Sequence, residues 1–207
     1  MKHLKFALAT ASLMLLSSVA SAEVYLGIGG GMTRSNAAER LEQSFIHDST
    51  SKREKNDIGF QLYGGYAFNK FVALEADYVD LGTYEFRGAN YGYDLQLSLK
   101  AKAYSLGVVG TVPLTDSIGL DGKLGIARVS QTFHCTLNCG NVSDTTNVST
   151  TGVLALGAHW DMTKNLRLRA SYEHFGGTKY RAYDNAGEEV SKTVDYGLLS
   201  AGIAVRF

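Results

Sequence analysis

Proline and cysteine are scarce in this chain, which has one proline and two cysteines among 207 residues. It also lacks an excess of charge of either sign, because 20 Lys and Arg balance 20 Asp and Glu. Nucleic-acid binding needs clustered basic charge, so this balance gives no reason to expect it. After the N-terminal stretch, no segment approaches the roughly 20 apolar residues that a membrane-spanning helix requires. The sequence therefore argues against a nucleic-acid-binding protein and against a helical membrane protein.

The N-terminal stretch "MKHLKFALATASLMLLSSVASAEV" has the pattern of a secretory signal peptide. Two lysines precede an apolar run over residues 6–16, and the small residues "ASA" end at Ala22. The apolar run is too short to span a membrane as a helix. We expect cleavage after Ala22, so that residues 1–22 are the signal peptide and residues 23–207 form a single domain.

Strand-forming composition and period-two alternation mark the rest of the chain. The whole chain has 23 glycines, which disfavour long helices, and 12 tyrosines and 9 phenylalanines, which favour strands. In "LRLRASYEHF", Leu166, Leu168 and Tyr172 alternate with charged or small residues, as in a strand with one apolar face. The same alternation predicts eight strands, at roughly 23–32, 57–68, 71–82, 95–112, 117–132, 149–161, 166–178 and 191–207.

The predicted connections alternate strictly between short and long. Short turns fall at 68–71, 112–117 and 161–165, and long loops fall at 33–56, 83–94, 133–148 and 179–190. All short turns and both chain ends then lie at one end of the sheet, and all long loops lie at the other. An even number of strands with this asymmetry is typical of bacterial outer-membrane barrels. The predicted fold is all-β, an eight-stranded antiparallel up-and-down transmembrane β-barrel.

A soluble barrel of the lipocalin type alternates as well, with its apolar face inside, so the direction of the faces needs separate evidence. The polar face combines charges with very small residues, which suits the narrow interior of an eight-stranded barrel. Charged residues facing lipid would cost a few kcal/mol each near the midplane. Bulky aromatics on the apolar face cluster near strand ends, as the interfacial girdles of membrane barrels do: Tyr66, Phe68, Trp160 and Phe207 at one end, and Tyr78, Tyr172 and Tyr196 at the other. These features favour a membrane barrel over a soluble one.

The chain resembles the OmpA-like transmembrane barrel family, which includes many small surface antigens. The resemblance is carried by "VYLGIGGG" (24–31), "YSLGVVGTVPLTDSIGLDGKLGIA" (104–127), "DMTKNLRLRASYEHFG" (161–176) and the terminal "AVRF". It implies that the outer-membrane assembly machinery recognises the terminal aromatic, Phe207. It also implies that interior charges form salt bridges that close the lumen, so that no open pore remains. Larger family members carry a peptidoglycan-binding domain after the barrel. This sequence stops at the barrel, so cell-wall tethering is not expected of it.

The polar face carries the interior charge network that we predict: Glu75, Asp77, Asp121, Lys123, Arg167, Arg169 and Glu173. Paired and hydrogen-bonded charges are tolerated inside a protein, whereas unpaired ones are costly. A structural network is therefore the favoured interpretation, with a proton or ion path as the alternative. Which charges pair depends on strand register, which the sequence leaves open.

The two cysteines, Cys135 and Cys139, are separated by three residues within "FHCTLNCGN". Export to an oxidising compartment predicts a disulfide between them, with a stabilisation at the low end of about 2–4 kcal/mol because the ring is short. The alternative is a metal site that includes His134, but a fourth ligand is missing. We expect no metal and no cofactor.

Catalysis needs a nucleophile and a base within hydrogen-bonding distance, or acids that position a water molecule. Ser171 and His174 lie three apart on one strand and so point to opposite faces. His159 and Asp161 share the inner face without a matching nucleophile. The expected protein is not an enzyme, although a lipid A-modifying enzyme and a narrow pore remain alternatives.

The predicted function is therefore that of a structural scaffold in the bacterial outer membrane that presents surface-exposed loops. Long loops on a rigid scaffold are where function usually lies, and those at 83–94 and 179–190 mix aromatics with charge. Envelope integrity, adhesion and surface recognition are the roles that this design suits. The expected partners are outer-membrane lipids and lipopolysaccharide, the assembly machinery that contacts the last strand, and a host or surface ligand.

Overall fold

The computed structural model describes residues 22–36, 52–53, 56–90, 93–137, 145–183 and 189–207, and within them every element of secondary structure is a β-strand. Their bounds are β1 (Glu23–Ser35), β2 (Lys52–Arg53), β3 (Asn56–Asn69), β4 (Val72–Asn90), β5 (Tyr93–Pro113), β6 (Ile118–Leu137), β7 (Thr145–Asp161), β8 (Leu166–Tyr183) and β9 (Glu189–Arg206). Among these residues, no helix is long and apolar enough to cross a membrane.

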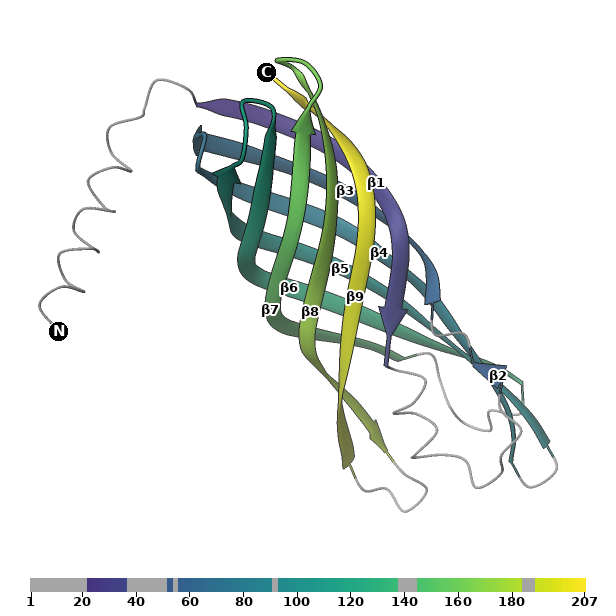
Figure 1. Ribbon diagram of the computed structural model, residues 1–207. Coiled ribbons are helices and arrows are strands. Elements are labelled where there is room, and N and C mark those ends of the chain that lie inside the picture. Colours follow the sequence, from purple (N-terminus) through teal and green to yellow (C-terminus); the bar gives the residue numbers. More distant parts are fainter. Residues whose placement is uncertain (1–21, 37–51, 54–55, 91–92, 138–144, 184–188) are drawn as a thin grey trace, which may run out of the picture.

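Eight of the strands form a closed antiparallel barrel, shown in Figure 1. Each barrel strand pairs with the next along the chain, and β1 pairs with β9 to close the ring. The remaining element, β2, pairs only with β4, through Lys52 opposite Arg87 and Arg53 opposite Phe86. The predicted fold class is thus confirmed.

Each of the three short turns is closed by one side-chain oxygen. Asn69 Oδ1 accepts hydrogen bonds from the amides of Phe71 and Val72 at 2.8 and 3.0 Å. Thr115 Oγ1 accepts from the amide of Ile118 at 3.0 Å, and Thr163 Oγ1 accepts from that of Leu166 at 3.0 Å. Asn and Thr side chains stabilise turns in this way by bonding backbone groups two or three residues away. The barrel end that carries these turns, together with Phe207, is called the turn end below, and the opposite end the outer end.

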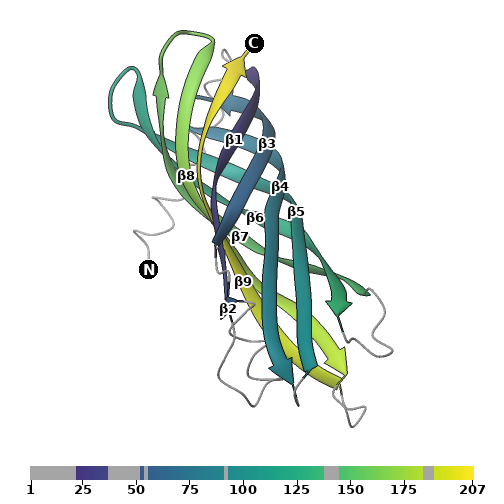
Figure 2. The ribbon, with the colours of Figure 1, turned by 90° about the vertical axis from the view of Figure 1, so that its right-hand side faces the viewer.

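The strands continue further towards the outer end than the sequence predicted. The predicted loop at 83–94 is mostly strand, because β4 and β5 stay paired as far as Asn90 opposite Tyr93. The predicted loops at 133–148 and 179–190 are shortened in the same way, and β1 continues to Ser35. Figure 2 shows these long hairpins extending below the barrel. The prediction ended the strand at residue 82, and the structure places a β-bulge there.

The bulge centres on Gly82, whose φ of 89° is readily adopted only by glycine. Asp80 Oδ1 accepts a hydrogen bond from the Gly82 amide at 3.0 Å, and Asp57 Oδ2 accepts one from the Thr83 amide at 2.6 Å. A bulge inserts one extra residue and bends a strand without ending it. The interruption of the alternation at this point therefore marks a bend in β4 rather than the start of a loop.

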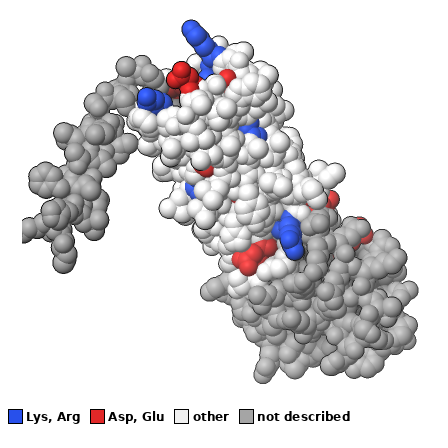
Figure 3. All heavy atoms as spheres, viewed as in Figure 1, with Lys and Arg blue, Asp and Glu red and all other residues white. Residues whose placement is uncertain are grey.

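The outer face of the barrel is apolar and exposed, as a lipid-facing surface must be. Leu26, Leu62, Leu124 and Leu156 point outward with 48–70% of their surface exposed. Figure 3 shows a broad, mostly uncharged band on one side of the barrel. The predicted direction of the two faces is thus confirmed. One assignment was wrong: Tyr196, predicted to face outward, is 1% exposed and points into the barrel, because even-numbered residues of β9 face inward.

Candidate functional site

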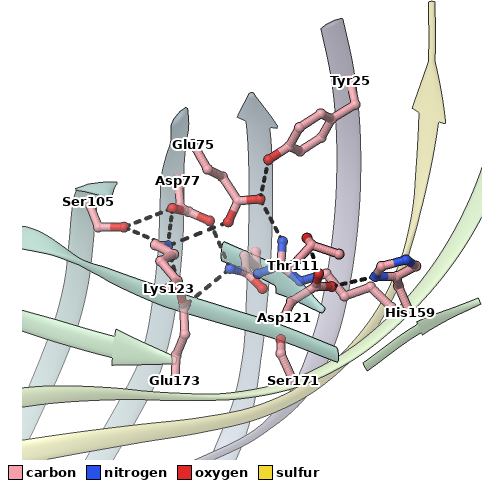
Figure 4. Close-up of polar contacts among 12 residues, drawn as sticks. Tyr25, Glu75, Asp77, Ser105, Thr111, Asp121, Lys123, His159, Ser171 and Glu173 are labelled. Atoms are coloured by element: carbon pink, nitrogen blue, oxygen red, sulfur yellow. Dashed lines mark hydrogen bonds and ion pairs between the residues drawn. The ribbon is translucent and has the colours of Figure 1, made fainter. Parts of the chain in front are cut away.

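A cluster of buried charges crosses the lumen around the ammonium group of Lys123, as Figure 4 shows. The Nζ atom donates hydrogen bonds to Asp77 Oδ2, to Glu173 Oε1 at 2.6 Å and to Ser105 Oγ at 3.1 Å. It also lies 3.7 Å from Glu75 Oε1. These groups come from β4, β5, β6 and β8, so one lysine connects strands on opposite sides of the barrel.

A second cation, Arg169, completes this buried cluster. Its Nη1 atom donates to Glu75 Oε2 at 2.6 Å, and the Tyr25 hydroxyl donates to the same oxygen at 2.8 Å. The guanidinium carbon lies 5.0 Å from the centre of the Tyr63 ring, within the range of a cation–π interaction.

Neutral donors offset the excess of negative charge in the cluster. Its three carboxylates, Glu75, Asp77 and Glu173, face two cations, Lys123 and Arg169. Gln61 Nε2 donates to Asp77 Oδ1 at 3.0 Å and to Glu173 Oε2 at 3.1 Å. Sequence reasoning missed the contributions of Gln61, Ser105 and Tyr25. Their inward parity on the strands was the available signal, but an uncharged residue on a polar face carries no mark of its partner.

The other predicted interior charges belong to two separate groups nearer the turn end. Asp121 accepts a hydrogen bond from Thr111 Oγ1 at 2.7 Å and lies 2.8 Å from His159 Nδ1. Arg167 donates to both oxygens of Asp161 at 2.6 and 3.1 Å, and Arg206 lies 3.3 Å from the same carboxylate. The interior charges thus form three groups rather than one network.

A cavity of about 410 Å³ lies at the turn end of the lumen. Its wall includes both of these turn-end groups and, from the buried charge cluster, Glu75 and Arg169. Basic and acidic residues are mixed throughout the wall, so the cavity has no strong preference for a charge of either sign.

The outer half of the lumen is filled by an apolar cluster, which we call the plug: Val79, Leu81, Tyr84, Leu99, Ala101, Ala103, Ala127, Val129, Val153, Phe175, Val194, Tyr196 and Leu198. All are at most 4% exposed. The rings of Tyr84 and Tyr196 lie 6.0 Å apart, and the Tyr84 hydroxyl donates to the Leu81 carbonyl at 3.0 Å.

The remaining predicted residues occupy the following positions. Ser171 is buried and lies 3.3 Å from Ser200 Oγ, while His174 is exposed on the opposite face, as their spacing predicted. Phe207 is 72% exposed at the turn end, and its amide donates to the Val24 carbonyl at 2.9 Å.

The Cys135 side chain and Cys139 lie outside the described residues, as do residues 1–21 of the predicted signal peptide. Within the described part of the chain, no group of three His, Cys, Asp or Glu side chains could hold a metal ion.

Comparison with known proteins agrees with this architecture. A family profile described as "OmpA-like transmembrane domain" matches residues 19–207. Outer membrane protein A of Escherichia fergusonii is 26% identical over 166 residues, which cover 77% of this chain and 43% of that protein, and the protein of the same name from Shigella dysenteriae gives the same values. The chain therefore spans less than half the length of these curated relatives.

Solved structures show the same fold. The outer membrane protein OprG from Pseudomonas aeruginosa has a TM-score of 0.61 at 15% identity, over 92% of this chain and 97% of that one. The attachment invasion locus protein Ail of Yersinia pestis has a TM-score of 0.53 at 18% identity, over 90% of this chain and 99% of that one.

Proposed function

The chain belongs to the OmpA-like transmembrane domain family, and from this premise we propose that it is a closed, non-enzymatic scaffold that holds long hairpins at the outer surface for recognition or adhesion. The protein is an outer-membrane β-barrel of bacteria. The finer role rests on one observation: the lumen contains a buried charge cluster and, beyond it, a plug of apolar side chains. A solute that entered the turn-end cavity would have to displace both.

In this proposal the buried charge cluster is structural. Lys123 and Arg169 connect strands that are distant along the chain, and breaking such a buried pair by removing one partner is strongly destabilising. We propose that the cluster stabilises the closed barrel and that Phe207 serves as the assembly signal. Lipopolysaccharide surrounding the outer rim and a ligand bound by the hairpins are the proposed partners.

Planar lipid bilayers provide the first test. Purified, refolded barrel should insert without steady conductance, because both the charge cluster and the plug obstruct the lumen. A matched sample of the Phe175→Ala variant shows whether the plug contributes to the seal, since Phe175 is completely buried within it. Stable openings in most insertions of the unmodified protein would overturn the closed scaffold and favour a narrow pore.

A second test addresses recognition. The barrel is expressed in non-adherent bacteria, either unmodified or with the β4–β5 and β8–β9 hairpins shortened at their outer ends. Both forms should assemble and shift in mobility on boiling, but only the unmodified form should promote attachment to surfaces coated with extracellular-matrix protein. Equal attachment by the two forms would contradict a recognition role for the hairpins.

A further inference from the structure

The ladder between β7 and β8 covers only part of each strand. The two strands pair from Asp161 opposite Arg167 to Val153 opposite Phe175. Beyond this point β7 continues to Thr145 and stays paired with β6, while β8 continues to Tyr183 and stays paired with β9. Residues 145–152 of β7 therefore have a strand on one side and no strand partner on the other within the described part of the chain. At about 3.3 Å per residue, this open edge is about 26 Å long.

A second bulge separates the two strands. The register of β8 with β9 shifts between Phe175 and Thr178, and Gly177 within it has a φ of 46°. The Gly177 amide donates a hydrogen bond to Asp195 Oδ1 at 2.7 Å, while the Asp195 amide donates to Asn36 Oδ1 at 2.9 Å. These bonds hold the β8–β9 hairpin in a bent position, and Figures 1 and 2 show its outer part pointing away from that of β7. The bend prevents β8 from covering the open edge.

The open edge lacks the features that usually prevent strand pairing. Natural edge strands carry lysine, proline or bulges that discourage pairing with other chains. Residues 145–152 read "TTNVSTTG", with no proline and no charge. Five of these eight residues are Thr or Val, which favour strands. The opposite edge of the same projecting sheet differs, because β2 pairs with the outer part of β4 there.

We propose that the outer edge of β7, residues 145–152, binds an extended segment of another protein by strand addition. This inference rests on the proposed recognition role and names the surface and the class of partner. Unpaired backbone amides and carbonyls in a row are complementary to another extended backbone, and main-chain hydrogen bonds supply the affinity in this mode of recognition. The absence of charge along the edge selects a segment of small or β-branched side chains with few charges.

A second copy of the chain does not fit this edge. Two barrels in one membrane share their orientation, and a closed dimer would be related by an axis along the membrane normal. Strands in such barrels tilt by about 35–45° from that axis, so two β7 edges would cross at a steep angle instead of lying antiparallel. A flexible segment of a different protein has no such restriction.

The test uses the full barrel refolded in detergent micelles and a synthetic ten-residue peptide of alternating Thr and Val. The peptide should slow amide hydrogen exchange at least tenfold at those residues of 146–152 whose amides face the open edge. The matched control is the same peptide with every amide N-methylated, which removes the hydrogen-bond donors from both edges and should give no protection. Protection by both peptides, or by neither, would overturn strand addition at this edge.

Two protein variants sharpen the result. Adjacent residues direct their amides to opposite edges of a strand, so one of Ser149→Pro and Thr150→Pro removes an amide from the open edge, and the other removes one from the β6–β7 ladder. The variant that keeps the mobility shift on boiling and normal exchange in β6 should lose protection by the peptide. Full protection in that variant would contradict the proposal. Steady conductance in bilayers would overturn the closed scaffold without affecting this measurement, so the two failures are distinguishable.

Discussion

Replacing Lys123 with methionine should destabilise the barrel more than any other single removal of a charge. Methionine has a similar length, so the main change is the loss of the ammonium group that Asp77, Glu173 and Ser105 surround. Arg169 still neutralises Glu75, but Asp77 and Glu173 lose their cation. Removing one partner of a buried ion pair costs about 3–5 kcal/mol. Since typical domains have about 5–15 kcal/mol of stability, the free energy of unfolding should fall by a large fraction.

Urea unfolding in lipid vesicles measures this loss. The chain has one tryptophan, Trp160, which lies on the outer face near the turn end and is 49% exposed in the protein, so its fluorescence reports transfer out of the lipid interface. The unfolding midpoint of Lys123→Met should lie well below that of the unmodified barrel. Lys100→Met is the matched control, because Lys100 is exposed and forms no ion pair within the described part of the chain.

A triple variant separates charge from packing. Adding Asp77→Asn and Glu173→Gln to Lys123→Met removes the uncompensated carboxylates and keeps the side-chain volumes similar. Most of the lost stability should return, because replacing a buried ionic group as a whole is far less costly than leaving its charges unpaired. If Lys123→Met unfolds within about 0.5 kcal/mol of the unmodified barrel, a typical limit for surface substitutions, the cluster is not structural. A triple variant no more stable than the single one would assign the loss to packing.

Three further predictions concern the plug, the last residue and the cysteines. Phe175→Ala should lower the free energy of unfolding by about 3–5 kcal/mol, since Phe175 is completely buried; a loss below 1 kcal/mol in the same urea titration would show that the plug is loosely packed. Phe207→Ala should reduce the amount of barrel in isolated outer membranes and leave refolding in detergent unchanged, because the ring is 72% exposed and contributes little packing; equal losses in both settings would contradict an assembly signal. Cys135 and Cys139 should resist alkylation until a reductant is added, as mass spectrometry would show, whereas two alkyl groups without reductant would rule out the disulfide.

The barrel and the direction of its faces could be predicted from the sequence because period two is a strong local signal. Leu166, Leu168 and Tyr172 alternate with charged residues, and every such strand must place its apolar face towards the same solvent. Turn chemistry was equally local, since Asn69, Thr115 and Thr163 stand where the strands reverse. The outer ends of the strands were less accessible, because the bulge at Gly82 interrupts the alternation in the same way as the start of a loop.

Pairing among the interior charges could not be predicted, for a physical reason. The contact between Lys123 and Glu173 crosses the lumen between β6 and β8, so it depends on the register of several ladders at once. A ladder that slips by two residues keeps every side chain on its face, so the alternation pattern alone does not fix the register. The plug was missed because Tyr196 and Leu198 are apolar residues on the inward face, where the alternation rule expects polar ones.

The obstacles to ion passage lie on one side of the lumen: a cavity occupies the turn end, and the buried charge cluster and the plug lie beyond it. The turn-end cavity, with a volume of about 410 Å³, is large enough for many water molecules, whereas the plug is packed with side chains that are at most 4% exposed. In the proposed closed barrel, a voltage across the membrane therefore falls mostly over the buried charge cluster and the plug. The turn-end groups that line the cavity, such as Asp161 and Arg167, stay near the potential of the turn side, so a voltage change does almost no work on them. An ion crossing the cluster and the plug would instead experience nearly the whole drop, about 2.3 kcal/mol per 100 mV for each elementary charge.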